Sequence, residues 1–241
     1  VFVGDGGVGM KQNGSDVTKG GDSRISGQTQ SVEFMANGGG IGLRYQSTTG
    51  NGEIPDSAGG SGGGGSFNTN ASRTGGASII PTTGSGDHKG FKGGDGFAST
   101  VWGAGGGGGG GAGSEGQNAS AAGHYAENGT DRYAGGMGGK GYKSSIKDNN
   151  DQIFIHYGAG GGGGAELQGN SEGNYLGGVG GFGGGGQGAA SYGGAGGDGT
   201  DDRGAGGGGG QTGGKGGSGI VIIRYKTVSY THLTLPTKDS V

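Results

Sequence analysis

The chain has 241 residues, of which 78 are glycine and only 27% are hydrophobic, so a conventional core of large side chains is excluded. Its formal net charge of −3 gives no basic surface for nucleic acid or for an anionic membrane. The absence of cysteine excludes disulfides, thiolate metal sites and cysteine nucleophiles, and no stretch approaches the ~20 apolar residues of a membrane helix.

Short strands are the predicted regular elements. Helix patterns are almost absent, because no window shows an apolar period of 3.6 and each glycine costs about 1 kcal/mol in a helix relative to alanine. In chain order, the strand candidates are Val1–Val3, Val32–Met35, Ile41–Tyr45, Ile79–Ile80, Ile153–Tyr157 and Ile220–Tyr225. The last is the strongest, because it is rich in β-branched residues, and its continuous apolar run predicts burial on both faces.

Two kinds of glycine tract lie between these strands. The first is a Gly-Ala-Gly block followed by further glycines, at Gly103–Gly111, Gly158–Gly164 and Gly204–Gly210. The second repeats a Gly-Gly-X triplet, in which X carries a side chain. It occurs at Gly135–Lys140, Gly177–Phe182, Gly193–Asp198 and Gly213–Ser218.

The triplets favour bundled helices of the polyglycine II type. Such a helix has three residues per turn, a rise of about 3.1 Å and no internal hydrogen bonds. Its two bare ridges let neighbouring rods touch and exchange backbone hydrogen bonds. X residues such as Met137, Val179 and Phe182 are then expected to face a small core or the surface. A flexible glycine linker is the alternative, whereas collagen is excluded because the chain has three prolines and no unbroken Gly-X-Y register.

Three polar insertions interrupt the tracts, at Gln46–Asn70, Ser114–Tyr133 and Tyr142–Gln152. Variable polar and aromatic loops on a rigid scaffold are typical of recognition surfaces. Tyr125, Tyr133 and Tyr142 are therefore the candidate receptor-contact residues, for stacking on sugars or contacting a protein. The alternative is that these loops only pack over the rods.

The two ends of the chain differ from the rest. Val1–Val3 has no initiator methionine before it and reads as the interior of a strand, which predicts an N-terminally truncated glycine-rich domain over residues 1–227. The segment Val228–Thr237 resembles a translated transposase sequencing adapter, so residues 228–241 are expected to be a non-native or disordered tail.

Several segments resemble the glycine-rich domains of phage tail fibre and adhesin-like proteins and of bacterial surface proteins. The strongest match is Gly213–Tyr225, a triplet tract that runs into a strand. Further matches are Val1–Gly9, Gly21–Ile25 and Val32–Gly40. The chain also resembles the extracellular glycine-rich domain of the anaplastic lymphoma kinase group, which normally belongs to a cysteine-containing ectodomain, and the glycine-rich antifreeze type, which lacks long polar insertions.

Residues that could carry chemistry are isolated. The phosphate-loop pattern fails because Lys140 and Lys215 are each followed by glycine, and the Rossmann pattern lacks a helix. His88, His124, His156 and His232 have no metal-ligand spacing, and His156 is expected on a sheet face. Asp198, Asp201 and Asp202 offer oxygen ligands for a weak calcium site, but a solvated turn is favoured.

These observations predict a mainly β and irregular protein of short strands and polyglycine rods, with no enzymatic activity, no cofactor and no metal. The resemblance implies a structural and attachment module of a phage tail fibre or cell-surface protein, located on a virion or at an extracellular surface. The expected partner is a cell-surface receptor or glycan. A homo-oligomer is compatible with the sequence, which sets no copy number. A glycine-rich receptor ectodomain and an ice-binding protein are the alternatives.

Overall fold

A computed structural model describes the chain in fourteen ranges. They are residues 1–9, 17–27, 33–41, 58–61, 63–64, 67–68, 71–72, 74–79, 89–98, 104–120, 134–147, 154–166, 176–190 and 193–225. Within these ranges there is no helix, and the regular elements are nine short strands. The predicted mainly β and irregular fold class is confirmed at this level.

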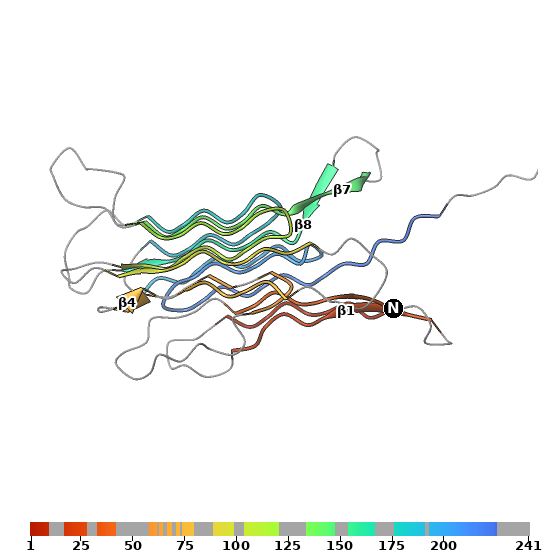
Figure 1. Ribbon diagram of the computed structural model, residues 1–241, viewed down its shortest axis with the longest axis horizontal. Coiled ribbons are helices and arrows are strands. Elements are labelled where there is room, and N and C mark those ends of the chain that lie inside the picture. Colours follow the sequence, from red (N-terminus) through yellow and green to blue (C-terminus); the bar gives the residue numbers. More distant parts are fainter. Residues whose placement is uncertain are drawn as a thin grey trace, which may run out of the picture.

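The strands form four small antiparallel sheets. β1 (Ser23–Ser26) pairs with β2 (Glu33–Ala36), and β3 (Phe67–Asn68) pairs with β4 (Ala71–Ser72). The third sheet has the order β5 (Phe97–Ala98), β6 (Ala104–Gly105) and β9 (Ala165–Glu166). β7 (Tyr142–Lys147) pairs with β8 (Phe154–Tyr157) in a hairpin at one end of the molecule (Figure 1).

Two of the predicted strands are confirmed with small shifts, since Val32–Met35 corresponds to β2 and Ile153–Tyr157 to β8. At the N-terminus, Phe2 forms only a single bridge, to Arg24. Ile41 and Ile79 are described but belong to no strand, and the rest of their predicted strands lies outside the described residues.

The prediction of a strand at Ile220–Tyr225, the strongest made from the sequence, is wrong. All six residues are described, and they pair with no described strand. The side chains are also not buried on both faces, because Ile223 is 64% exposed and Tyr225 is 79% exposed. High β-propensity stabilises a strand only where neighbours supply hydrogen bonds and side-chain contacts, and the described chain places no such neighbour beside this segment.

Most of the described chain consists of glycine segments that run side by side along the long axis of the molecule (Figure 1). Segment 158–165 lies at their centre. Its N–H groups donate to segments 134–141 and 184–190, and its carbonyls accept from segments 104–112, 176–182 and 204–211. Five neighbouring segments therefore bond to this one segment, and their cohesion comes from backbone hydrogen bonds rather than from large side chains.

The buried apolar residues are small. They are Ala119, Ala159, Ala165, Ala189, Ala205 and one larger residue, Ile41. No large side chain among the described residues is fully buried. The closeness of the backbones explains this composition. A methyl group added to Gly163 would overlap the carbonyl oxygen of Gly106 in the neighbouring segment.

The two kinds of glycine tract occupy different positions in the molecule. The three Gly-Ala-Gly blocks lie in segments 104–112, 158–165 and 204–211, which we call the central segments and which bond to one another in the order given. The Gly-Gly-X triplets lie in outer segments, where the X residues face solvent. Met137, Val179 and Phe182 are 45%, 58% and 68% exposed. Of the two expected environments for these residues, the surface is therefore the one observed.

Tight turns join consecutive segments. Segments 176–182 and 184–190 connect through Gly183 and Gly184, whose φ angles are 118° and 106°. Residues other than glycine rarely adopt φ angles in this region. The turn therefore requires glycine for its backbone conformation, independently of the close packing that requires glycine within the segments.

Short polar side chains cover backbone N–H groups along the outer segments. Asp198 Oδ1 accepts from the Lys215 N–H at 2.7 Å, and Asp201 Oδ1 accepts from the Ser218 N–H at 3.1 Å. The same arrangement links Asp22 to Gly38, Asp95 to Gly75, Asn118 to Asp95 and Ser114 to Lys140. At these positions a side-chain oxygen takes the place that a further neighbouring carbonyl would occupy.

Removal of one such cap is expected to weaken the bundle modestly. Asp198→Ala should lower the free energy of unfolding by about 1 kcal/mol, because the Lys215 N–H loses its acceptor but remains accessible to water. Denaturant unfolding measures the change. Glu115→Ala is the matched control, since Glu115 is an exposed acidic residue whose side chain bonds to no other described residue. An equal loss in both variants would contradict the capping role.

Candidate functional site

The described residues on either side of 121–133 and of 167–175 lie at the same end of the bundle. Ser120 and Ala134 exchange two backbone hydrogen bonds of 3.2 Å, and Ala134 also bridges to Leu176. At this same end β6 pairs with β9, which ends at Glu166. Ser120, Ala134, Glu166 and Leu176, which flank residues 121–133 and 167–175, therefore lie at one end of the molecule. The beginning of the predicted insertion Ser114–Tyr133 belongs instead to segment 113–119, which bonds to segments 104–112 and 134–141.

Tyr142 lies at the opposite end of segment 134–141 from Ala134. It opens β7, stands opposite Tyr157 in the β7–β8 register and is 46% exposed. The predicted insertion Tyr142–Gln152 thus begins with a strand, and β7 and β8 form the hairpin that leaves the bundle in Figure 1. Tyr125 and Tyr133, the other two candidate contact residues, lie outside the described residues.

An apolar row runs along one outer segment. Leu176, Val179 and Phe182 follow one another at the spacing of the triplet, and all three are exposed. Met137 is also exposed, on segment 134–141, which bonds to the row through the Leu176, Val179 and Phe182 carbonyls. His156 of β8 packs edge-on against Phe182, with ring centroids 4.7 Å apart. The sheet-face position predicted for His156 agrees with its place in β8.

The acidic cluster is engaged in structural hydrogen bonds. Asp198 and Asp201 accept from backbone N–H groups of segment 213–219, and Asp202 Oδ1 accepts from the Ser218 hydroxyl at 3.2 Å. Among the described residues no group of three or more His, Cys, Asp or Glu could hold a metal ion. His88, His124 and His232 lie outside the described part of the chain.

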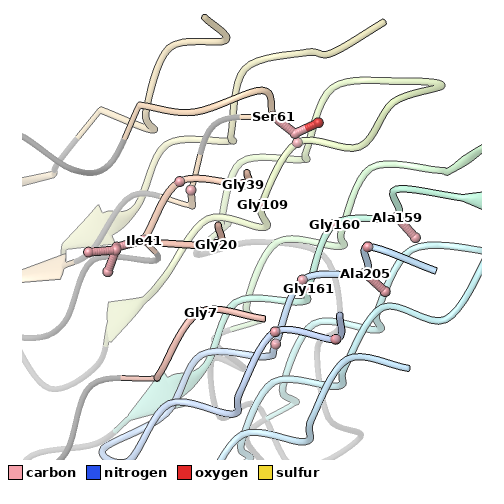
Figure 2. Close-up of a pocket in the computed structure, with 18 of the residues that line it drawn as sticks. Gly7, Gly20, Gly39, Ile41, Ser61, Gly109, Ala159, Gly160, Gly161 and Ala205 are labelled. Atoms are coloured by element: carbon pink, nitrogen blue, oxygen red, sulfur yellow. The ribbon is translucent and has the colours of Figure 1, made fainter. Parts of the chain in front are cut away.

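A cavity of about 670 Å³ lies within the bundle and is lined mainly by glycine. Figure 2 shows residues of the N-terminal segments, among them Gly7, Gly20 and Gly39, on one side and residues of the central segments, among them Gly161 and Ala205, on the other. Most of its wall therefore offers backbone N–H and C=O groups, and the charged and aromatic residues of the lining are few: Asp5, Lys89, Tyr142, Tyr157 and Arg203. The central segments consist almost entirely of glycine and alanine, and this composition gave no signal of the cavity in the sequence.

Comparisons with known proteins found no counterpart for this chain: no family model, no curated protein and no solved structure matches it. In the part of the chain that the structure describes, no helix has the length and apolar character needed to cross a membrane.

Proposed function

We propose that the glycine segments are polyglycine II helices, and that the chain is a non-enzymatic structural and attachment module of a phage tail fibre or cell-surface protein. In this function the bundled helices form a rigid body, and the polar loops contact a receptor or glycan. The proposal places the module on a virion or at an extracellular surface, and it requires no cofactor and no catalytic step.

The observation that carries the proposal is the direction of the backbone hydrogen bonds, which repeats every third residue. In segment 158–165, the N–H groups of Gly160 and Gly163 donate to segment 134–141, whereas those of Gly162 and Ala165 donate to segment 184–190. A β-strand alternates with a period of two, but a polyglycine II helix turns by one third at each residue. The period of three therefore favours polyglycine II.

The attachment role is supported by where the insertions leave the scaffold. The described residues that flank 121–133 and 167–175 lie at one end of the bundle, and the β7–β8 hairpin lies at the other. Loops that a rigid body presents together at its end are a common basis for recognition. An exposed aromatic residue such as Tyr142 offers a large contact area at a low cost in conformational entropy.

Loop replacement tests the attachment role. The structure restricts each exchange to residues outside the glycine segments and the hairpin strands. Residues 42–57, 121–133 and 148–153 are each replaced by a Gly-Ser linker of equal length, and residues 80–88 are replaced in the same way as a control. Binding of each purified variant to a panel of bacterial cells and to a glycan array is then measured.

At least one of the three loop variants is expected to lose about tenfold or more in apparent affinity for a surface that the parent chain binds, while the 80–88 control retains it. Parent-level binding by all three variants would overturn the role of these loops. Failure of the parent chain to bind any surface in the panel would count against the attachment function itself.

A further inference from the structure

Eight chain segments surround the glycine-lined cavity in a closed ring. They are 4–9, 17–21, 37–41, 58–64 in its described residues, 104–112, 158–165, 204–211 and 213–219. Each segment contacts the next, through backbone hydrogen bonds or, between Gly64 and Gly107, through a close backbone approach. In a hexagonal array of rods one position has six neighbours, and two adjacent positions together have eight. The ring therefore encloses the space of two rods.

The central segments point unpaired N–H groups into this space. In a trans peptide unit the N–H of one residue points away from the carbonyl of the residue before it. The carbonyls of Gly160 and Gly163 accept from segment 176–182, which lies on the outer side of segment 158–165. The N–H groups of Gly161 and Gly164 therefore point the opposite way, toward the cavity that both residues line.

The same relation holds for segment 204–211. The carbonyls of Gly206 and Gly209 accept from segment 184–190. The N–H groups that follow them, on Gly207 and Gly210, belong to residues that line the cavity. Neither of these glycines, nor Gly161 or Gly164, donates a hydrogen bond to another described residue.

A donor left unpaired in a buried position costs free energy, about 1–3 kcal/mol for each group. Gly161 and Gly164 are buried. Elsewhere in the bundle, aspartate, asparagine and serine oxygens cover such N–H groups. The cavity offers no such cap to Gly161 or Gly164, so these two N–H groups form a row of donors that a further carbonyl-bearing rod would satisfy.

We propose that this cavity is a binding channel for two adjacent glycine-rich rods supplied by a polypeptide segment that is not among the 241 residues. The inference rests on the polyglycine II assignment proposed above. A rod of that type presents one carbonyl every three residues along each ridge, about 9 Å apart. This spacing matches donors that lie three residues apart, as Gly161 and Gly164 do.

The chain's own glycine tracts do not supply the occupant. Every Gly-Ala-Gly block and every Gly-Gly-X tract already lies in a described segment that bonds to its neighbours. A second copy would have to withdraw one of these segments from its own bundle. The occupant must itself be rich in glycine, because the walls are bare backbone at the contact distance of neighbouring segments.

The test uses the full 241-residue chain labelled with ¹⁵N-glycine and a synthetic peptide with the sequence of residues 176–190, which form two adjacent segments in the structure. The control peptide carries alanine at the positions of Gly178, Gly181, Gly185 and Gly188. Saturating glycine peptide is expected to slow the exchange of the Gly161, Gly164, Gly207 and Gly210 amides by about tenfold or more, and the alanine peptide is expected to leave it unchanged.

A pair of protein variants locates the binding site. A side chain added at Gly39, which lines the cavity, would approach only the Ser61 carbonyl oxygen, at 3.9 Å, whereas Gly27 lies away from the cavity with nothing within 4 Å. Gly39→Leu should weaken peptide binding by about tenfold or more, because its side chain competes for space at the channel. Gly27→Leu should bind the peptide as the parent does.

Each other outcome overturns the proposal in a recognisable way. Unchanged exchange of the Gly161, Gly164, Gly207 and Gly210 amides at saturating peptide means a water-filled cavity. Equal slowing by the alanine peptide removes the requirement for glycine, and slowing that grows with protein concentration without peptide identifies a second copy as the occupant. If the Gly160, Gly162 and Gly163 amides exchange as fast as in an unfolded peptide, the proposed polyglycine bundle fails along with the channel.

Discussion

Replacement of Gly162 by alanine is expected to lower the free energy of unfolding by about 3 kcal/mol or more, enough to unfold many domains of this size. The added methyl group would overlap the carbonyl oxygen of Gly178 in the neighbouring segment. This overlap can be relieved only if the backbones of segments 158–165 and 176–182 move apart. Separation would also strain the hydrogen bond of 2.9 Å from the Gly162 N–H to the Gly186 carbonyl. Denaturant unfolding followed by circular dichroism measures the loss.

Gly27→Ala is the matched control for this substitution. A methyl group at Gly27 would meet nothing within 4 Å. Where alanine fits without strain, it stabilises a protein by about 0.4–1 kcal/mol, because it restricts the unfolded chain. The two alanine variants should therefore differ in sign as well as in size. Losses of similar size in both would mean that the close approach of the segments does not determine stability.

Proline substitutions in the triplet tract 177–182 are expected to lower stability by amounts that depend on their position. Gly178→Pro removes the N–H that donates to the Gly163 carbonyl at 2.7 Å and sets its ring carbons against the Gly136 carbonyl. The expected loss is about 3 kcal/mol or more. Val179→Pro should change stability by less than about 1 kcal/mol, because the Val179 N–H donates to no described residue and its side chain is 58% exposed.

The reason for the tolerance at Val179 is conformational. Proline fixes φ near −65°, close to the value of a polyglycine II helix, and the residue before proline favours the same region. The two proline variants can be compared by thermal unfolding under identical conditions. A large loss for Val179→Pro would argue against a threefold helix at this position, because the ring would then oppose the backbone conformation instead of matching it.

The glycine periodicity predicted several of the exposed positions. The triplets at Gly177–Phe182 and Gly213–Ser218 place one side chain at every third residue, and the structure has the X residues Val179, Phe182 and Lys215 at the surface. The Gly-Ala-Gly blocks carry a further signal of their central position, since a segment with close neighbours on most sides has little room for side chains larger than a methyl group.

The neighbour relations could not be predicted from the sequence. Glycine segments present nearly identical surfaces, so nothing in the sequence shows that segment 158–165 bonds to five particular neighbours. Strand prediction failed at Ile220–Tyr225 for a related reason, because its propensity for β-structure has no effect without a partner strand. The capping aspartates did leave a signal, since Asp198 and Asp201 are three residues apart and so lie on one ridge.

The near absence of large buried side chains has a thermodynamic consequence. Unfolding of an ordinary domain exposes hydrocarbon, which raises the heat capacity by about 12–15 cal/mol/K per residue, whereas exposed peptide groups lower it. The interior of the described part of the chain consists of peptide groups, a few methyl groups and Ile41. The heat-capacity increment of unfolding should therefore be small, so the free energy of unfolding should change almost linearly with temperature and continue to rise on cooling instead of passing through a maximum.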